Sequence, residues 1–393
     1  MTEATGQPSG QPSGQPTGPR VLIAAGGTGG HVMPGLALAR TLAARAPGTV
    51  VTWAGTSRGI ESRAVAAAGI ELDLLPILPL SRRLSVDSVL APFAAVAGTL
   101  AARSLIRRRG ADVVVGMGGY VTLPVAIGAR LAGVPVVLHE QNAIPGLANR
   151  LAARVATVVA LGVPEAAGAF GGARTVPVGN PVRPELAHLD RDALREAALA
   201  EFGLRPDRYT VFVFGGSQGA RRLNQAIIET AGRWPHPGLV QILHACGGRD
   251  EELVKAGWTE VADRLGALHV SVVPFIDRMD LAYAVADLAV CRAGALTVAE
   301  LTAAGLPAIM VPLPHAVGGH QAANARVLAR AGGVVAVDDA ELDGARLVRE
   351  ADELLGQPRE LARMAKTMRD LSRPDAAREL ADLVLAAAGR GLP

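Results

Sequence analysis

The sequence predicts an α/β protein built from two Rossmann-like domains whose parallel sheets face one cleft. An apolar strand-like run, a burst of glycines and a helical pattern follow one another at 21–39, and the same order returns at 209–230. Strand-like runs also alternate with helical stretches in both halves, as in parallel sheets covered on both faces. One glycine turn is a weak signal, but two such units in a chain of 393 residues indicate two nucleotide-binding halves.

The first unit begins the predicted first domain, 20–180. Its strand, 20–25, runs into Gly26-Gly27-Thr28-Gly29-Gly30-His31, and Pro34 falls in the first turn of the expected helix, where proline is favoured. Glycines allow a ligand close to the backbone, and a helix start offers unpaired N–H groups and a positive dipole end. This loop is therefore predicted to bind an anion, most naturally a phosphate. The other strands expected in this domain are 50–54, 72–75, 112–116, 134–139 and 157–160, and a third glycine cluster, 116–120, follows the fourth of the six.

A stretch of turn formers, 179–184, is expected to be the hinge to a second domain at 181–373. The strands expected there are 209–214, 240–245, 268–273, 288–291, 308–311 and 333–337. The chain is helical by pattern from about 341, and the residues 372–375 break that pattern. The last helix, about 374–389, can return to the first domain.

Composition limits the class of protein. Half of the residues are apolar, 19% are charged and the net charge is +3, which is too small to argue for nucleic acid. Residues 1–19 repeat Gln-Pro-Ser-Gly, lack the features of a signal peptide and are expected to form a disordered tail. The longest apolar window, 89–102, contains Pro92 and falls short of the roughly 18 residues that a membrane span needs. Cys246 and Cys291 fit no disulfide framework, so buried free thiols and a reducing compartment are expected.

The glycine loops do not match the common nucleotide fingerprints. The first loop is not G-x-G-x-x-G, and no acidic residue ends the second strand to hold a ribose, which disfavours NAD. No G-x-x-x-x-G-K-[ST] loop for a nucleoside triphosphate occurs either. A different nucleotide site is predicted at 291–300, where N–H groups at 294–297 can take a phosphate and Glu300 can accept two hydrogen bonds from a ribose diol. The alternative is an ordinary surface glutamate.

These motifs together resemble one family. In order along the chain they are GGTGGH (26–31), GMGGY (116–120), HEQN (139–142), GNPVR (179–183), GGSQGA (215–220), CRAGALTVAE (291–300) and HQxxNA (320–325). The set, over about 20–390, closely resembles the MurG family of glycosyltransferase family 28. Those bacterial enzymes add N-acetylglucosamine to the lipid-linked muropeptide precursor of peptidoglycan. The resemblance implies the two-domain GT-B architecture, UDP-N-acetylglucosamine as substrate, and neither a cofactor nor a metal.

The resemblance also implies a set of donor-binding residues. Arg183 and helix-end N–H groups suit the diphosphate, Glu300 the ribose, and Gln321 and Asn142 the sugar hydroxyls, while the backbone of Ile276 would face the uracil. The preceding loop, 314–320, is one residue longer than in some relatives, which leaves its sugar contacts open. The full implied set is Thr28, Gly29, Gly30, Asn142, Arg183, Ser217, Ile276, Ala295, Leu296, Thr297, Val298, Ala299, Glu300 and Gln321.

The implied acceptor is a polyprenyl diphosphate that carries a muramyl peptide. Its diphosphate is expected at the glycine loops of the first domain, on Gly26, Gly27, Gly118, Gly119 and Tyr120. His31 and Glu140 are both candidates for the general base, and the histidine is alternatively an anion ligand or a turn stabiliser. The other readings of the chain are a different glycosyltransferase, a UDP-N-acetylglucosamine 2-epimerase, and a non-catalytic sensor of nucleotide sugars.

The lipid tail of such an acceptor implies a peripheral protein at the cytoplasmic face of the cell membrane. Within 76–109, apolar side chains stand beside arginines, a pattern typical of docking on an anionic leaflet. The alternative is a solvated basic helix over ordinary core, and partners among cell-wall synthesis proteins are also conceivable. The residues of this segment are Ile77, Leu78, Leu80, Leu90 and Phe93, with Arg82, Arg83, Arg103, Arg107, Arg108 and Arg109.

Overall fold

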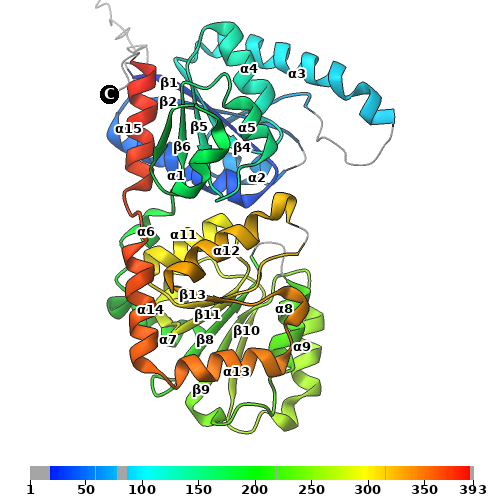
Figure 1. Ribbon diagram of the computed structural model, residues 1–393, viewed down its shortest axis with the longest axis vertical. Coiled ribbons are helices and arrows are strands. Elements are labelled where there is room, and N and C mark those ends of the chain that lie inside the picture. The colour runs from blue at the N-terminus through cyan, green and yellow to red at the C-terminus, as the bar shows by residue number, and fades with distance from the viewer. Residues whose placement is uncertain (1–17, 58, 78–85, 217–219, 315, 390–393) are drawn as a thin grey trace, which may run out of the picture.

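The computed structural model describes residues 18–57, 59–77, 86–216, 220–314 and 316–389, and of 86–94 and 317 it describes the backbone only. Two α/β bodies lie one above the other along the long axis (Figure 1). Each contains one parallel sheet covered by helices on both faces. This confirms the predicted fold of two Rossmann-like domains.

The first sheet has seven parallel strands in the order β3-β2-β1-β4-β5-β6-β7. One face packs on α1 (Gly29–Arg45) and the other on α3 (Val86–Arg109) and α4 (Thr122–Ala132). Because both faces are covered, the central strands are apolar throughout, and all six residues of β4 are buried. The strands are β1 (Arg20–Ala25), β2 (Val50–Gly55), β3 (Glu71–Leu74), β4 (Val113–Gly118), β5 (Val136–Glu140), β6 (Val158–Leu161) and β7 (Thr175–Pro177).

The second sheet has six parallel strands in the order β10-β9-β8-β11-β12-β13. Its strands are β8 (Tyr209–Phe214), β9 (Val240–Ala245), β10 (His269–Val273), β11 (Leu288–Cys291), β12 (Ala308–Met310) and β13 (Val334–Ala336). The helices around it are α7 (Arg191–Phe202), α8 (Arg221–Ile228), α9 (Glu251–Glu260), α10 (Met279–Val285), α11 (Ala295–Ala304), α12 (His320–Ala331), α13 (Gly344–Leu355) and α14 (Pro358–Asp370).

Both sheets reverse their strand order at a central pair, β1/β4 in the first and β8/β11 in the second. Ligands of open α/β sheets bind outside the carboxyl ends of the strands at such a switch point. The glycine loops at 26–30 and 118–119 follow β1 and β4, and the loop at 292–294 follows β11. The topology therefore places the motifs predicted from the sequence at the two switch points.

The chain crosses between the domains twice, at neighbouring places. The first crossing follows β7 and leads through Gly179 to α6 (Pro184–Ala187), and the second leads from α14 to α15 (Ala376–Ala388). Gly179 has a φ of +87°, and a Cβ on it would lie 2.4 Å from the Cβ of Arg373. The last helix then packs against α1 of the first domain (Figure 1).

The strand β7 is not predicted from the sequence. This strand has three residues, lies at the edge of the sheet and ends on Pro177, whose missing N–H is tolerated at an edge. The expected strand at 134–139 begins two residues later, at Val136, after Pro135. None of the described helices is both long and apolar enough to cross a membrane.

Candidate active site

The candidate site lies where loops of the two domains meet. Asn324 of α12 hydrogen-bonds to two residues of the first domain: the N–H of Ala143 donates to its Oδ1 (3.0 Å), and its Nδ2 donates to Asn142 Oδ1 (3.2 Å). His320 at the start of the same helix lies with Nδ1 2.5 Å from the carbonyl oxygen of Ile144. These contacts hold the segment after β5 against α12, so the loops of the two domains face each other here.

The loop after β1 leads into the amino-terminal end of α1. Thr28 is the N-cap residue in extended conformation, and the first helical turn contains no acidic residue. Within the described part of the chain, the N–H groups of Thr28, Gly29 and Gly30 have no hydrogen-bond partner. Unpaired N–H groups and an uncompensated positive dipole end favour an anion here.

The loops after β1 and β4 pack directly on each other. Gly118 and Gly119 have φ values of +102° and +80°. A Cβ on Gly118 would lie 2.6 Å from Cδ2 of His31, and one on Gly119 would lie 2.5 Å from the carbonyl oxygen of Gly26. Glycine is therefore required at both positions by backbone conformation, and also by the close approach of the His31 ring at Gly118 and of the Gly26 carbonyl at Gly119.

His31 has the surroundings of a neutral imidazole. Burial lowers its pKa below the ordinary value of 6.5, and the charge of Glu140 offsets part of this effect. Its Nδ1 lies 3.4 Å from the Thr28 hydroxyl, at the long end of hydrogen-bond distances. A neutral imidazole at the mouth of a phosphate loop can accept a proton from a substrate hydroxyl.

Glu140, the other candidate base, is buried and fully engaged. One carboxylate oxygen accepts from the backbone N–H and the Nδ2 of Asn142, at 3.0 and 3.1 Å. The other accepts from the backbone N–H of Gly146 and from Asn149 Nδ2, at 3.2 and 2.9 Å. The carboxylate thus holds together the turn after β5, and its geometry disfavours a role as general base.

The second wall is built around the start of α11. Gly294 is its N-cap residue, and no acidic residue lies in the first turn. Glu300, on the inner side of α11, is 7% exposed, and its Oε2 accepts a hydrogen bond from the Tyr283 hydroxyl at 2.8 Å. Burial raises the pKa of Glu300, and the Tyr283 hydrogen bond offsets part of the shift.

Arg183 lies beside this carboxylate. Its Nη2 is 3.9 Å from Glu300 Oε1, and its Nη1 donates to the carbonyl oxygen of Asp277 at 3.1 Å. The residues predicted to bind the diphosphate and the ribose are therefore neighbours. One oxygen of Glu300 is taken by Tyr283, which leaves the other, facing Arg183, as the acceptor for a ligand hydroxyl.

The remaining predicted donor residues are dispersed around the cleft. Gln321 accepts from the backbone N–H of Leu313 at 2.9 Å, and Ile276 is 7% exposed. Asn142 uses its oxygen on Asn324 and its amide nitrogen on Glu140, which is the pattern of a bridging residue rather than of a free sugar ligand. Ser217 lies outside the described residues.

Several side chains that build this site are not predicted from the sequence. Asn324 belongs to the HQxxNA motif, which was its only signal, and it is 2% exposed. Tyr283 and Glu61 carry no local signal, because each reaches the site through a tertiary contact. Among the described residues, no group of three or more His, Cys, Asp or Glu side chains is arranged to hold a metal ion.

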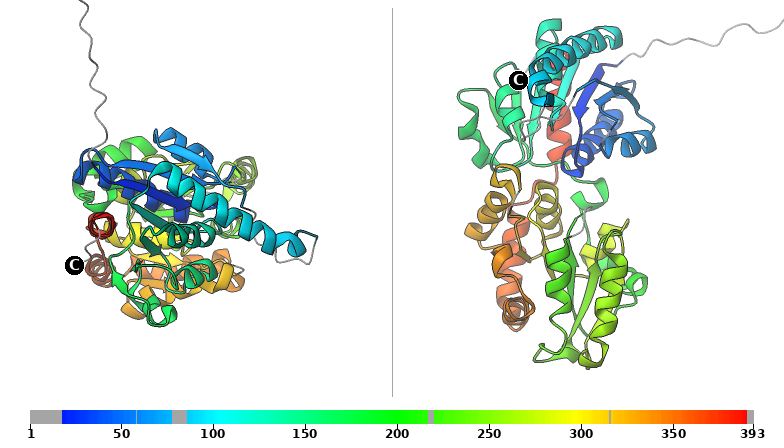
Figure 2. Two further views of the ribbon diagram at one scale, coloured as in Figure 1. Left: turned by 90° about the horizontal axis from the view of Figure 1, so that it is seen from above. Right: turned by 90° about the vertical axis from the view of Figure 1, so that its right-hand side faces the viewer.

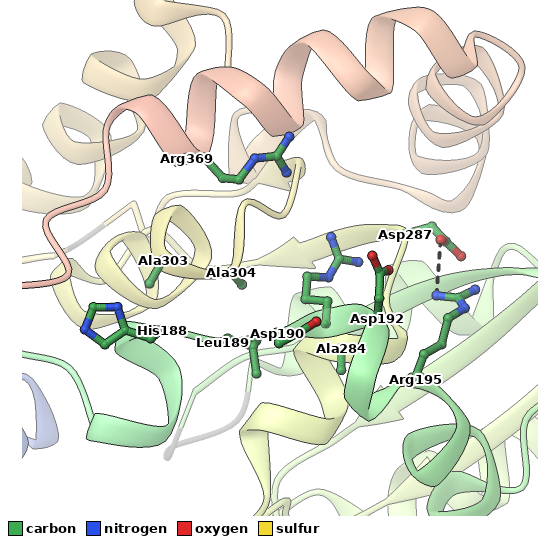
Figure 3. Close-up of a pocket in the computed structure, with 11 residues that line it drawn as sticks. His188, Leu189, Asp190, Asp192, Arg195, Ala284, Asp287, Ala303, Ala304 and Arg369 are labelled. Atoms are coloured by element: carbon green, nitrogen blue, oxygen red, sulfur yellow. Dashed lines mark ion pairs between the residues drawn. The ribbon is translucent and has the colours of Figure 1, made fainter.

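A cavity of about 720 Å³ lies elsewhere on the second domain, between α7, α10, α11 and α14 (Figure 3). Arg195 pairs there with Asp287 at 3.6 Å, and Arg191 donates to the carbonyl oxygens of Tyr283 and Ala286. These arginines fasten α7 to the end of α10. None of the residues predicted for the site lines this cavity.

Comparison with known proteins gives a consistent result across the chain. Residues 21–161 match the glycosyltransferase family 28 N-terminal domain, and 210–380 match the glycosyltransferase family 28 C-terminal domain. A UDP-N-acetylglucosamine–N-acetylmuramyl-(pentapeptide) pyrophosphoryl-undecaprenol N-acetylglucosamine transferase of Nocardioides sp. is 46% identical over 366 residues, which cover 93% of this chain and 97% of that protein.

Two solved structures extend the comparison. The crystal structure of MurG from Acinetobacter baumannii is similar with a TM-score of 0.76 and 33% identity, covering 93% of this chain and 99% of that one. A UDP-N-acetylglucosamine 2-epimerase is similar with a TM-score of 0.64 at 15% identity, covering 95% of this chain and 98% of that one. The second likeness is one of fold alone.

Proposed function

The chain belongs to glycosyltransferase family 28, and from this membership we infer that it transfers N-acetylglucosamine from UDP-N-acetylglucosamine to the muramyl sugar of an undecaprenyl-diphosphate-linked muropeptide (lipid I to lipid II). The observation that carries this function is the identity of 46% with a transferase of that name over nearly the full length of both proteins. The matched region therefore includes the loops of both domains that form the candidate site.

The second domain takes the donor in this proposal. The start of α11, capped by Gly294, offers N–H groups to the diphosphate, and the free oxygen of Glu300 accepts from the ribose. Arg183, 3.9 Å from that carboxylate, reaches toward the same nucleotide and supplies positive charge as UDP departs. Gln321 has its amide nitrogen available for a sugar hydroxyl, since only its oxygen is engaged by Leu313.

The first domain takes the acceptor. Its sugar hydroxyl attacks the anomeric carbon of N-acetylglucosamine from the face opposite UDP, so the α-linked donor gives a β-linked product. The bond from the anomeric carbon to the UDP oxygen breaks, and the hydroxyl proton passes to the general base. His31 is the proposed base, because its ring is half-buried at the phosphate loop and its lowered pKa keeps it neutral near pH 7.

The first domain also docks on the cytoplasmic face of the membrane in this proposal. The amino-terminal end of α3 extends beyond the body of the domain (Figure 2), and the opposite end, which lies on the body, carries Arg107, Arg108 and Arg109. Arg109 is bound to Asp73 at 2.8 Å, and Arg108 lies 3.7 Å from the same carboxylate. Arg107 and Arg108 are nevertheless exposed, with exposed apolar side chains of the same helix nearby in sequence. Such basic residues contribute about 1 kcal/mol each near an anionic surface.

One residue that the sequence suggested for membrane docking is buried in the structure. Ile77 is 8% exposed and packs in the core under α3, because the chain turns inward after β3. Leu78, Leu80, Arg82 and Arg83 lie outside the described residues. The side chains of Leu90 and Phe93 are likewise not described.

Release of UDP with and without a lipid-linked muropeptide tests the proposed function. We expect UDP release only when both substrates are present, and a product that carries one more N-acetylglucosamine by mass. Turnover of the donor without acceptor would instead support the epimerase reading, and binding without turnover would support a sensor.

A further inference from the structure

A buried carboxylate occupies one end of the glycine loop after β1. Glu61, the first residue of α2 (Glu61–Ala67), is 0% exposed. Its Oε2 accepts from the backbone N–H of Gly27 at 3.1 Å. Its Oε1 accepts from the backbone N–H and the hydroxyl of Thr56, at 3.2 and 2.9 Å. The N–H of Gly27 is therefore already used within the protein, and it is not free for a diphosphate.

Three glycines make room for this carboxylate. A Cβ on Gly26 would lie 2.8 Å from Glu61 Oε1, one on Gly55 would lie 3.0 Å from its Cγ, and one on Gly59 would lie 1.7 Å from its Oε2. None of the three glycines has a positive φ. The structure requires glycine at these positions because a side chain would not fit, and not because of the backbone conformation. Glycines from the loop after β1, from the end of β2 and from the connection before α2 thus surround one acidic group.

The same carboxylate fixes the orientation of Tyr120. The Thr56 hydroxyl has one proton and gives it to Glu61, so at 2.7 Å from the Tyr120 hydroxyl it accepts the tyrosine proton. The two glycine loops are therefore connected through a chain of hydrogen bonds that runs from Gly27 through Glu61 and Thr56 to Tyr120.

We propose that Glu61 is a positioning residue for the acceptor: it ties Gly27 and Tyr120 into a fixed frame that turns the N–H groups of Thr28, Gly29 and Gly30 toward the acceptor's diphosphate, in place of the donor contact that the resemblance implies for these three residues. This rests on the proposed function. The negative charge of Glu61 lies behind the loop and keeps the diphosphate on the outer side, at the unpaired N–H groups and the start of α1. The frame acts through the loop, so it affects binding of the acceptor and not of the donor.

Glu61→Gln tests the proposal, because it keeps the volume of the side chain and replaces one accepting oxygen with an amide group that cannot accept. Because the variant loses a hydrogen bond that holds the loop in place, we expect the KM for a short-chain acceptor analogue to rise at least about tenfold. The KM for UDP-N-acetylglucosamine should stay within about twofold of the wild-type value.

Asp287→Asn is the matched control, since this half-buried carboxylate accepts from the backbone N–H of Thr210 at 2.7 Å, at the amino-terminal ends of β8 and β11 and opposite the carboxyl ends where the candidate site lies. We expect it to lower the melting temperature without changing either KM. Thr56→Val and Thr56→Ser provide a second pair that does not alter the carboxylate: valine should raise the acceptor KM, and serine, which keeps the hydroxyl, should restore it.

Each result of these measurements supports or contradicts the proposed role of Glu61. An unchanged acceptor KM in Glu61→Gln, or a serine variant that behaves like the valine one, would show that the network only stabilises the fold. A rise in the donor KM alone would assign the loop to the donor's diphosphate and overturn the proposal. If the wild-type protein releases no UDP with the acceptor, the proposed function itself fails, and that result is visible before any variant is measured.

Discussion

Replacing Asn324 with alanine should loosen the contact between the two domains. The side chain uses its whole amide group: Oδ1 accepts from Ala143, and Nδ2 donates to Asn142 and to the carbonyl oxygen of Ala293. The first two bonds cross between the domains, and the third holds the loop before α11. Alanine removes all three while it leaves the helix α12 intact, because alanine is a good helix former.

The size of the effect follows from these bonds. A typical hydrogen bond contributes about 1 kcal/mol to stability, and a buried partner left unsatisfied costs about 1–3 kcal/mol. Two interdomain bonds are therefore worth about 2 kcal/mol, which corresponds to roughly a 30-fold shift in the ratio of closed to open forms. The third bond adds about 1 kcal/mol of instability within the second domain.

Small-angle X-ray scattering and calorimetry together measure this change. We expect Asn324→Ala to raise the radius of gyration and to separate the unfolding of the two domains. Asn224→Ala is the control, since Asn224 is also 2% exposed and sits in a helix of the same domain, but its side chain, within the described residues, bonds to Cys246, Asp250 and His244 of that same domain. A double-mutant cycle with Asn142→Ala isolates the crossing bond. Strict additivity in that cycle, with an unchanged radius of gyration, would refute the reasoning.

Four further results are expected. His31→Ala should lower kcat at least about tenfold, and near-normal turnover of this variant would remove His31 from the mechanism. Because burial lowers the pKa of His31, the acid limb of the wild-type pH profile should fall below pH 6.5. Glu300→Gln keeps a partner for Tyr283 but loses the charge near Arg183, so the donor KM should rise at least about tenfold while the acceptor KM stays constant. Burial lowers the pKa of His244 to about 4, so the folded state resists its protonation; stability should be constant above pH 6.5 and decline by up to about 3 kcal/mol as the pH falls toward 4. Urea unfolding of His244→Gln should lack this part of the pH dependence. Charge reversal of Arg107 and Arg108 should reduce flotation with anionic vesicles, and equal flotation of the variant and the wild type would exclude docking by this helix.

The sequence predicts the fold well because its signals are local. Continuous apolar runs followed by glycines mark the central strands, which are buried on both faces and need no partner to be recognised. The edge strand β7 was not predicted, because its three residues, which end in Pro177, show neither an apolar run nor an alternation of apolar and polar side chains. Boundaries moved by one or two residues where, as at Val136, hydrogen bonding to a neighbour decides where pairing begins.

The candidate site is predictable only in part, for the same reason. The glycine loops and Glu300 stand next to their own strand or helix start, so spacing alone brings them to the cleft. Glu61 reaches Gly27 across 34 positions of the sequence, and Asn324 reaches Ala143 across 181. Contacts of this kind are fixed by the packing of whole elements. The roles of the predicted site residues stay predictions, to be tested by measuring substrate binding and turnover.

The return of α15 to the first domain has a consequence for how the protein is made. Its residues Leu380, Ala381 and Val384 fill the same hydrophobic cluster as β1 and α1. A ribosome adds about 5–20 residues per second, so the roughly 200 residues between β7 and α15 take about 10–40 s to emerge. During that interval the amino-terminal half has one apolar face without its cover. The half that is translated first is thus the half that is completed last, and a prematurely terminated chain would expose that face to chaperones and proteases.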